Sequence, residues 1–174
     1  MSPRITRILL AVVLLALLGI AYQYWFSDRA RLNRSLTRLE ELLTKPGAEE
    51  PVVAAANSRA VTRMLAPGFV LLATPYENAT ITDPQLVFAG VMRLRQAGEA
   101  VDTDFTEREV DLRRGNRTAT VFFLATVTLD LGDRRGREAY RVRTIWREEE
   151  GEWLLAEAEV TEVVGDRGDL GIWN

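Results

Sequence analysis

The sequence predicts an α+β protein, in which an N-terminal transmembrane helix precedes three helices packed on one face of an antiparallel sheet. Three observations support this fold class. Ile8 to Phe26 is an apolar stretch without a charge. From Asp28 to Gly98, most apolar residues recur every three or four positions, as in amphipathic helices. Beyond Gly98 the period changes to two, which is typical of antiparallel strands with one buried face.

The composition excludes several classes of function. The 174-residue chain contains no cysteine and no histidine. Zinc sites of the usual kind, thiolate nucleophiles and imidazole acid–base chemistry are therefore excluded, and we expect no cofactor and no metal. The net charge of −3 gives no electrostatic reason to bind nucleic acid. All but one of the 22 basic residues are arginine, as in GC-rich coding, and we expect a bacterial source.

Residues 1–27 are predicted to anchor the chain in a membrane. As a helix, Ile8–Phe26 would extend about 28 Å, close to the ~30 Å hydrocarbon core of a bilayer. Aromatic residues at its far end suit the membrane interface. The alternative is a cleaved signal peptide with a small-x-small site at Gly19–Ala21. The arginines between Arg29 and Arg38 favour a cytoplasmic domain by charge bias, whereas the short basic N-terminus favours export.

We expect a single-pass signal-anchor that contacts the lipid bilayer through Ile8–Phe26, with the following domain on the extracytoplasmic side. An amphipathic helix and a linker, residues 28–49, come next, because leucines recur at helical spacing as far as Leu43 and "KPGAEEP" breaks the pattern. A second helix is predicted over 52–66, with Pro67–Gly68 as its stop.

The third helix and the strands follow from local signals. Asp83–Pro84 opens a helix with a capping side chain and a proline in its first turn, and Gly98 ends it. A buried strand is predicted over 69–74, with a short strand after it. The alternating stretch "TATVFFLATVTLDL" begins at Thr118, and further strands follow, with turns at Gly115–Asn116, 132–136 and 148–152. Residues 165–174 are predicted to be a tail.

The last two predicted strands carry a pattern found in one superfamily. Ile145–Trp146–Arg147 precedes an acidic turn with one glycine, and Trp153–Leu154–Leu155 begins the final strand. With the order of elements, this pattern resembles the nuclear transport factor 2-like superfamily, which includes SnoaL-like polyketide cyclases, ketosteroid isomerase and membrane-anchored assembly domains of secretion systems. The resemblance covers residues 50–164. It implies a cystatin-like cone: a strongly curved antiparallel sheet around helices, a pocket at the open end, and dimerisation through the sheet.

The resemblance also implies where catalytic groups would stand. The steroid isomerases use a tyrosine on an early helix, an aspartate at the end of the first strand and a protonated aspartate on a later strand. This chain has no tyrosine between Ser27 and Pro75, has Ala73–Thr74 at the end of the first strand, and has Arg143–Thr144 on the later one. The missing histidine removes the dehydratase-type arrangement as well. We therefore assign no catalytic residue.

The sequence thus predicts a membrane-anchored, non-catalytic binding or assembly module that forms a homodimer or binds an envelope protein. One alternative is a SnoaL-like or ketosteroid-isomerase-like enzyme that acts on a small apolar substrate through an Asp/Tyr pair. Another is a cleaved precursor that releases a soluble ligand-binding domain. Candidates for lining a ligand pocket are Tyr76, Asp104, Tyr140 and Trp146, although turn residues and core aromatics with a satisfied polar tip are the more ordinary interpretation. Phe122 and Leu124 interrupt the polar face of their strand and are candidates for an interface.

Overall fold

The computed structural model describes residues 27–74, 79–113, 115, 117–132 and 135–164, with isolated positions 13, 15 and 19. The chain forms two compact units, Met1–Arg34 and Ser35–Asn174. Nearly all of the predicted anchor Ile8–Phe26 lies outside the described residues. Among those that are described, no helix combines the length and the apolar character needed to cross a bilayer.

Helix α2 (Asp28–Leu43) forms where the leucine spacing predicts it. In the first unit, the Ser27 hydroxyl accepts a hydrogen bond from the amide of Ala30 at 3.2 Å and so caps the helix. Leu32 is buried there, and Arg31 pairs with Asp28 at 2.7 Å. The predicted amphipathic helix is therefore present.

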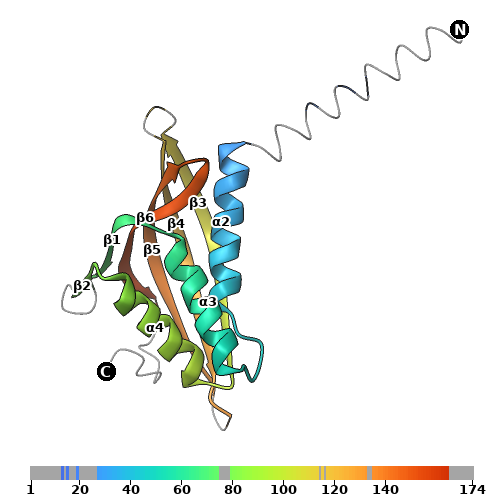
Figure 1. The fold of residues 1–174 in the computed structure, drawn as a ribbon, viewed down its shortest axis with the longest axis vertical. Coiled ribbons are helices and arrows are strands. Elements are labelled where there is room, and N and C mark those ends of the chain that lie inside the picture. The colour runs from blue at the N-terminus through green and yellow to red at the C-terminus, as the bar shows by residue number, and fades with distance from the viewer. Residues whose placement is uncertain are drawn as a thin grey trace, which may run out of the picture. The chain divides into compact units, whose positions relative to one another are not determined.

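The second unit contains the rest of α2, two more helices and one sheet (Figure 1). The helices are α3 (Pro51–Arg63) and α4 (Pro84–Ala97). The strands are β1 (Leu65–Ala73), β2 (Ala79–Ile81), β3 (Ala100–Arg113), β4 (Thr118–Asp130), β5 (Arg135–Glu149) and β6 (Glu152–Val164).

The six-stranded sheet has the order β2-β1-β6-β5-β4-β3. Strands β3 to β6 form the predicted antiparallel meander, but β1 pairs with β6 in parallel. The expectation of a purely antiparallel sheet is therefore wrong, and the sheet is mixed. The reason is topological: the whole meander separates β1 from β6 in the sequence, so no hairpin turn sets their relative direction.

The second helix ends earlier than predicted. It stops at Arg63, and Leu65 already belongs to β1, whose pairing with β6 is irregular between Leu65 and Val70. Pro67 and Gly68 lie inside this irregular stretch. Because regular pairing is interrupted there, a proline without an amide hydrogen and a glycine with φ of 75° are both tolerated. In α4 the apolar residues do not all face the core, because Leu86 is 56% exposed whereas Arg95 is buried.

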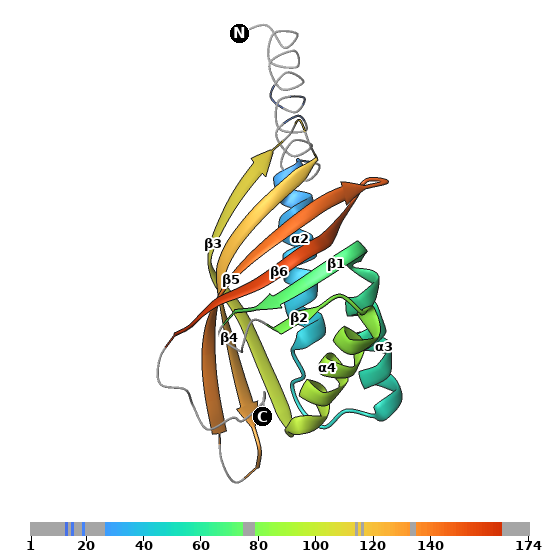
Figure 2. The same ribbon diagram turned by 90° about the vertical axis from the view of Figure 1, so that its left-hand side faces the viewer.

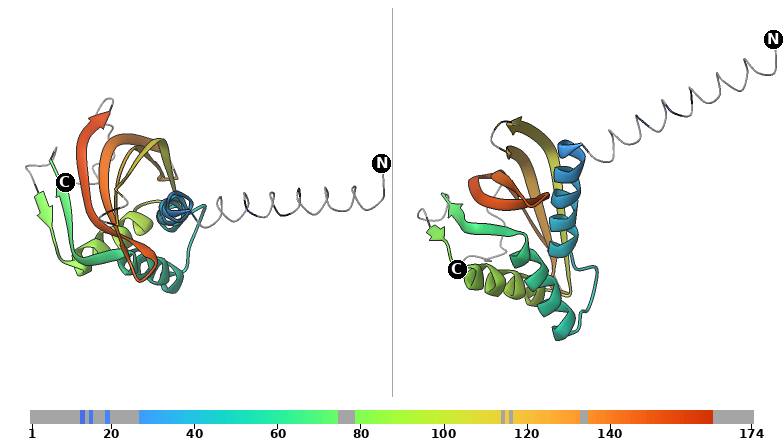
Figure 3. Two further views of the ribbon diagram at one scale, coloured as in Figure 1. Left: turned by 90° about the horizontal axis from the view of Figure 1, so that it is seen from above. Right: turned by 45° about the horizontal axis from the view of Figure 1, so that its top comes forward.

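Bulges give the sheet its strong curvature, which Figure 2 shows along β4, β5 and β6 and Figure 3 shows from two further directions. Strand β3 has an irregularity between Thr106 and Glu109, opposite Leu124 of β4. Strand β6 has one opposite Arg141 and Val142 of β5 and another opposite Ile145 and Trp146. Because Leu124 pairs with Arg141, the bulge of β3 and the first of these two bulges of β6 lie at one level of the sheet, and each bends its strand there. The curved α+β architecture predicted from the sequence is confirmed.

The helices cover one face of the sheet, called here the inner face. The end of α2 lies along β3: the Thr44 hydroxyl donates to the carbonyl of Thr103 at 3.2 Å, and Glu40 pairs with Arg108. The core on this face comes from alternate residues of the strands, as the period of two predicts, and includes Val101, Phe105, Val121, Phe123, Leu129, Trp146 and Leu155. The opposite face is the outer face.

A buried basic group ties α4 to the chain that follows α2. The Arg95 guanidinium donates to both carboxylate oxygens of Glu49, at 2.8 and 2.5 Å, and to the carbonyls of Leu42 and Thr44. The Lys45 ammonium donates to the carbonyls of Arg95 and Gly98 at 2.8 and 2.5 Å. These bonds satisfy carbonyls at the ends of two helices, which would otherwise lack partners.

Candidate functional site

The outer face carries a row of arginines on β5. Because alternate residues share a face, Arg135, Arg137, Arg141, Arg143 and Arg147 all point outward. The last three are paired with glutamates. For example, Arg143 contacts Glu159 at 2.7 Å and also Glu157.

The two glutamates raise the pKa of Arg143 above its ordinary value, chiefly through the hydrogen bond to Glu159. Arg141 pairs with Glu107 and Glu162, and Arg147 pairs with Glu149. We assign these three arginines a structural role at the surface of the sheet, where each exposed ion pair contributes little to stability.

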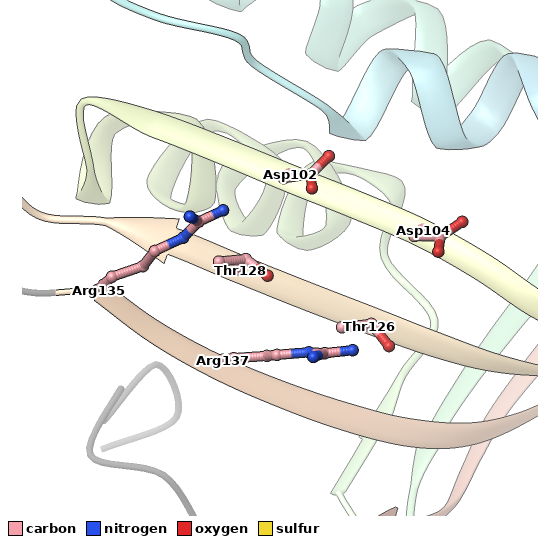
Figure 4. A pocket seen from close by; sticks show the side chains of 6 residues that line it. All are labelled: Asp102, Asp104, Thr126, Thr128, Arg135 and Arg137. Carbon is pink, nitrogen blue, oxygen red and sulfur yellow. The ribbon is translucent and has the colours of Figure 1, made fainter.

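The other two arginines border a cavity of about 510 Å³ on the outer face (Figure 4). We call it the polar groove and define it by six residues from three adjacent strands: Asp102, Asp104, Thr126, Thr128, Arg135 and Arg137. Figure 4 shows the acidic side chains on β3, the threonines on β4 and the arginines on β5. The predicted pocket residue Asp104 therefore lines a cavity, but on the outer face of the sheet.

The register explains this grouping. Asp102 pairs with Thr128, and Thr128 pairs with Arg137, so the three form one row across the strands. Asp104 pairs with Thr126 in the next row that faces the same side. Acidic and basic side chains therefore stand on opposite sides of a threonine floor, and Thr126 is buried at that floor.

A second polar group lies on the inner face. The Tyr140 hydroxyl donates to the carboxylate of Glu138, and both residues are buried, Glu138 being 9% exposed. Glu138 and Thr103 each pair with Val127 and so share one row. The hydroxyl of Thr103 is buried, and within the described residues it has no hydrogen-bond partner. A carboxyl group, a phenol and a free hydroxyl thus come from two strands of the inner face.

The other predicted pocket residues are placed as follows. Trp146 is completely buried, and its indole nitrogen donates to the Thr144 hydroxyl at 2.9 Å, so it is a core aromatic with a satisfied polar tip. Tyr140 belongs to the inner-face pair. Tyr76 lies outside the described residues. The structure therefore brings no two of the four candidates together in one cavity among the residues that it describes.

The predicted interface residues lie on the outer face of β4. Phe122 is 45% exposed, and Leu124 is half-buried. Phe122 lines a cavity of about 360 Å³ together with Arg141 and Thr161, at the level of the bulges. In the described ranges, no group of three acidic side chains is placed to hold a metal ion.

Sequence reasoning missed Glu138 and the arginines of the polar groove. A signal for Glu138 existed: it shares the parity of Tyr140 and Val142 on β5, and a glutamate at a core-facing position of a strand is unusual. The groove had no such signal, because its six residues come from three separate strands.

The fold of this chain is similar to the folds of solved structures. No family model matches the sequence, and no curated protein matches it either. Solved structures do match. A nuclear transport factor 2-like protein with a cystatin-like fold from Novosphingobium aromaticivorans superposes with a TM-score of 0.63 at 15% identity, covering 85% of this chain and 90% of that one.

Two other similar structures bear different functional descriptions. A protein described as a calcium/calmodulin-dependent protein kinase II association domain, from Xanthomonas campestris, has a TM-score of 0.59 at 16% identity, covering 78% of this chain and 89% of that one. A scytalone dehydratase-like protein from Novosphingobium aromaticivorans has a TM-score of 0.60 at 8% identity, covering 79% and 86%. One scaffold thus carries both association and enzyme descriptions. The chain has the cystatin-like α+β fold of nuclear transport factor 2-like proteins.

Proposed function

We propose that this protein is a non-catalytic binding or assembly module, held at a membrane by Ile8–Phe26, whose contact surface is the outer face of the sheet around Phe122. A second copy of the chain is the partner that we favour, and an envelope protein is the other. The observation that carries the proposal is the exposure of Phe122, an aromatic side chain on a strand face whose other residues, apart from Leu124, are polar. Large exposed aromatic groups are typical of protein–protein contacts.

The positions that hold catalytic groups in the steroid isomerases also support a module. Strand β1 ends at Ala73, and Thr74 follows it. On β5, Thr144 is buried and donates its hydroxyl to the carbonyl of Val121 at 3.2 Å, while Arg143 points outward to its glutamates. None of these side chains is a carboxylic acid that could transfer a proton.

Sedimentation equilibrium of the full chain in a mild detergent tests the module. We expect a dimer at micromolar concentration, and we expect Phe122→Asp to dissociate it, since a charge would be buried at the contact. Leu86→Asp is the matched control, because Leu86 is also an exposed apolar residue but lies on α4. A monomeric wild type that also binds no envelope protein, or a Phe122→Asp variant that stays dimeric, would contradict the proposal.

Carbonate extraction of membranes, with the mass of the N-terminus, tests the anchor. We expect the intact chain in the membrane fraction. A soluble product that begins after Gly19–Ala21 would show that the segment is a cleaved signal peptide instead.

A second candidate function rests on the inner-face pair. A buried carboxyl group hydrogen-bonded to a buried phenol is the kind of arrangement that can move a proton to or from a small apolar substrate. For this enzyme hypothesis, Glu138 and Tyr140 would replace the missing Asp/Tyr pair. 2-Naphthol, an aromatic enol analogue, would then bind to the chain, and Tyr140→Phe would weaken its binding about tenfold. No binding of 2-naphthol up to its solubility limit would remove this candidate.

A further inference from the structure

We propose that the polar groove binds a small zwitterion, a ligand with an ammonium group at one end and a carboxylate at the other. The ammonium group would lie between Asp102 and Asp104, and the carboxylate would lie on Arg135 and Arg137. This inference is independent of the proposed function, because it concerns a different part of the outer face from Phe122.

The four charges of the polar groove have no partner within the part of the chain that the structure describes. Across the residues that the structure describes, neither the two aspartates nor the two arginines form an ion pair or a side-chain hydrogen bond. The other three outward arginines of β5 all pair with glutamates. Among the described residues of this strand face, the groove therefore differs from its surroundings: its arginines and aspartates lie on nearby strands of the sheet surface without forming ion pairs.

The position of these charges in the sheet explains why they remain unpaired. Strand β6 pairs with β5 only as far as Ala139, so no glutamate of β6 stands beside Arg135 or Arg137. On the other side, β4 contributes threonines, and the aspartates lie one strand further away. Backbones two strands apart are separated by roughly 10 Å, so an occupant is needed to connect the acidic row to the basic row.

The occupant that fits both rows carries charges of both signs. A simple anion would be attracted by the arginines and repelled by the aspartates, and a simple cation would meet the reverse. A zwitterion aligned across the strands gains charge-assisted hydrogen bonds at both ends, including bidentate contacts from arginine. The hydroxyls of Thr126 and Thr128 lie below its middle and can donate or accept.

The size and the polarity of the groove also fit a small charged ligand. The groove volume of about 510 Å³ lies within the range of small-molecule sites. Among the described residues, its lining contains no aromatic or large aliphatic side chain, so these residues offer an apolar ligand or a nucleobase nothing to pack against. Because the two rows are far apart, a ligand with its charges several bonds apart fits better than glycine.

Isothermal titration of the full chain with 6-aminohexanoate tests the site, with glycine, hexanoate and hexylamine as comparison ligands. We expect 6-aminohexanoate to bind at least tenfold more tightly than the other three, because only it carries both charges at the required separation. Asp102→Asn and Arg137→Gln should each weaken its binding about tenfold, the effect of losing one charge-assisted contact.

The matched control variants are Asp111→Asn and Arg147→Gln, which remove one charge from the same two strands outside the groove. They should leave binding of 6-aminohexanoate unchanged. Equal binding of hexanoate or hexylamine, equal effects of the control variants, or no measurable heat at millimolar ligand would overturn the proposal.

A second copy of the chain is the competing occupant, since a two-fold axis through the threonines would set the acidic row of one copy against the basic row of the other. Sedimentation of the Asp102→Asn and Arg137→Gln variants separates the two. Loss of a dimer in these variants would assign the groove to an interface and overturn the ligand site, whatever the result for Phe122→Asp.

Discussion

Replacing Arg95 by methionine should destabilise the protein more than any surface change. The Arg95 side chain is 2% exposed, and its partner Glu49 is 11% exposed. Methionine fills much of the space but donates no hydrogen bond, so the Glu49 carboxylate would stay buried without its cation. The carbonyls of Leu42 and Thr44 would lose a donor as well.

The magnitude follows from these partners. Breaking a buried ion pair by removing one member costs about 3–5 kcal/mol, and a buried carbonyl left without a donor costs about 1–3 kcal/mol. The losses overlap, because water can reach the vacated site, and we expect the free energy of unfolding to fall by about 4 kcal/mol. That is a large part of the ~5–15 kcal/mol that stabilises an ordinary domain.

Urea unfolding followed by tryptophan fluorescence measures this change, since Trp146 and Trp153 are buried. A double variant, Arg95→Met with Glu49→Met, should recover part of the loss, because no unpaired charge then remains. A loss below about 1 kcal/mol in Arg95→Met would refute the reasoning. A double variant that is less stable than Arg95→Met by as much as Glu49→Met alone destabilises the protein would refute it as well.

Four further changes have expected outcomes. The hydrogen bond from Arg95 holds the pKa of Glu49 below its ordinary value of 4.5. As pH drops below about 4.5, the unfolded chain therefore binds a proton at Glu49 before the folded chain does, and the free energy of unfolding should fall. Urea unfolding at a series of pH values should show a smaller fall in Glu49→Gln. Gly98→Ala would place a methyl group 2.5 Å from a backbone carbonyl of β4 and should lower the free energy of unfolding by about 1–3 kcal/mol. Gly90 lies in a helix, and nothing lies within 4 Å of an added methyl group there, so Gly90→Ala should raise the free energy of unfolding by about 0.5–1 kcal/mol in the same assay. Trp146→Phe should lower the melting temperature, because it leaves a cavity in the core and removes the indole hydrogen bond.

Local patterns predicted most of the secondary structure. The leucine spacing located α2, Asp83 and Pro84 marked the start of α4, where the Asp83 carboxylate accepts from the amide of Gln85 at 2.8 Å, and the acidic turn joins β5 to β6. In that turn Glu150 and Gly151 both have positive φ, 51° and 88°, as a tight hairpin requires. Each of these signals acts within a few residues, so the sequence displays it directly.

Features that join distant segments were not predicted. The predicted end of α3 was wrong because Leu65 and Ala66 continue the helical pattern, although Leu65 pairs with Leu155 in the sheet. The burial of Arg95 in α4 had no local signal, because its partner Glu49 precedes α3. In both cases a long-range contact overrides a local preference.

The candidate sites divide in the same way. Period-two alternation alone indicates that Asp104 and Phe122 point away from the core. It also indicates that Tyr140 and Trp146 point into the core, because the face of each side chain follows from its position along one strand. The register between strands decides that Asp102 stands in a row with Arg137, and that Glu138 and Thr103 flank one valine. The parallel placement of β1 beside β6 is decided at the same level. A single strand specifies its own two faces, whereas the neighbours on each face exist only once backbone hydrogen bonds have aligned segments that lie far apart in the chain.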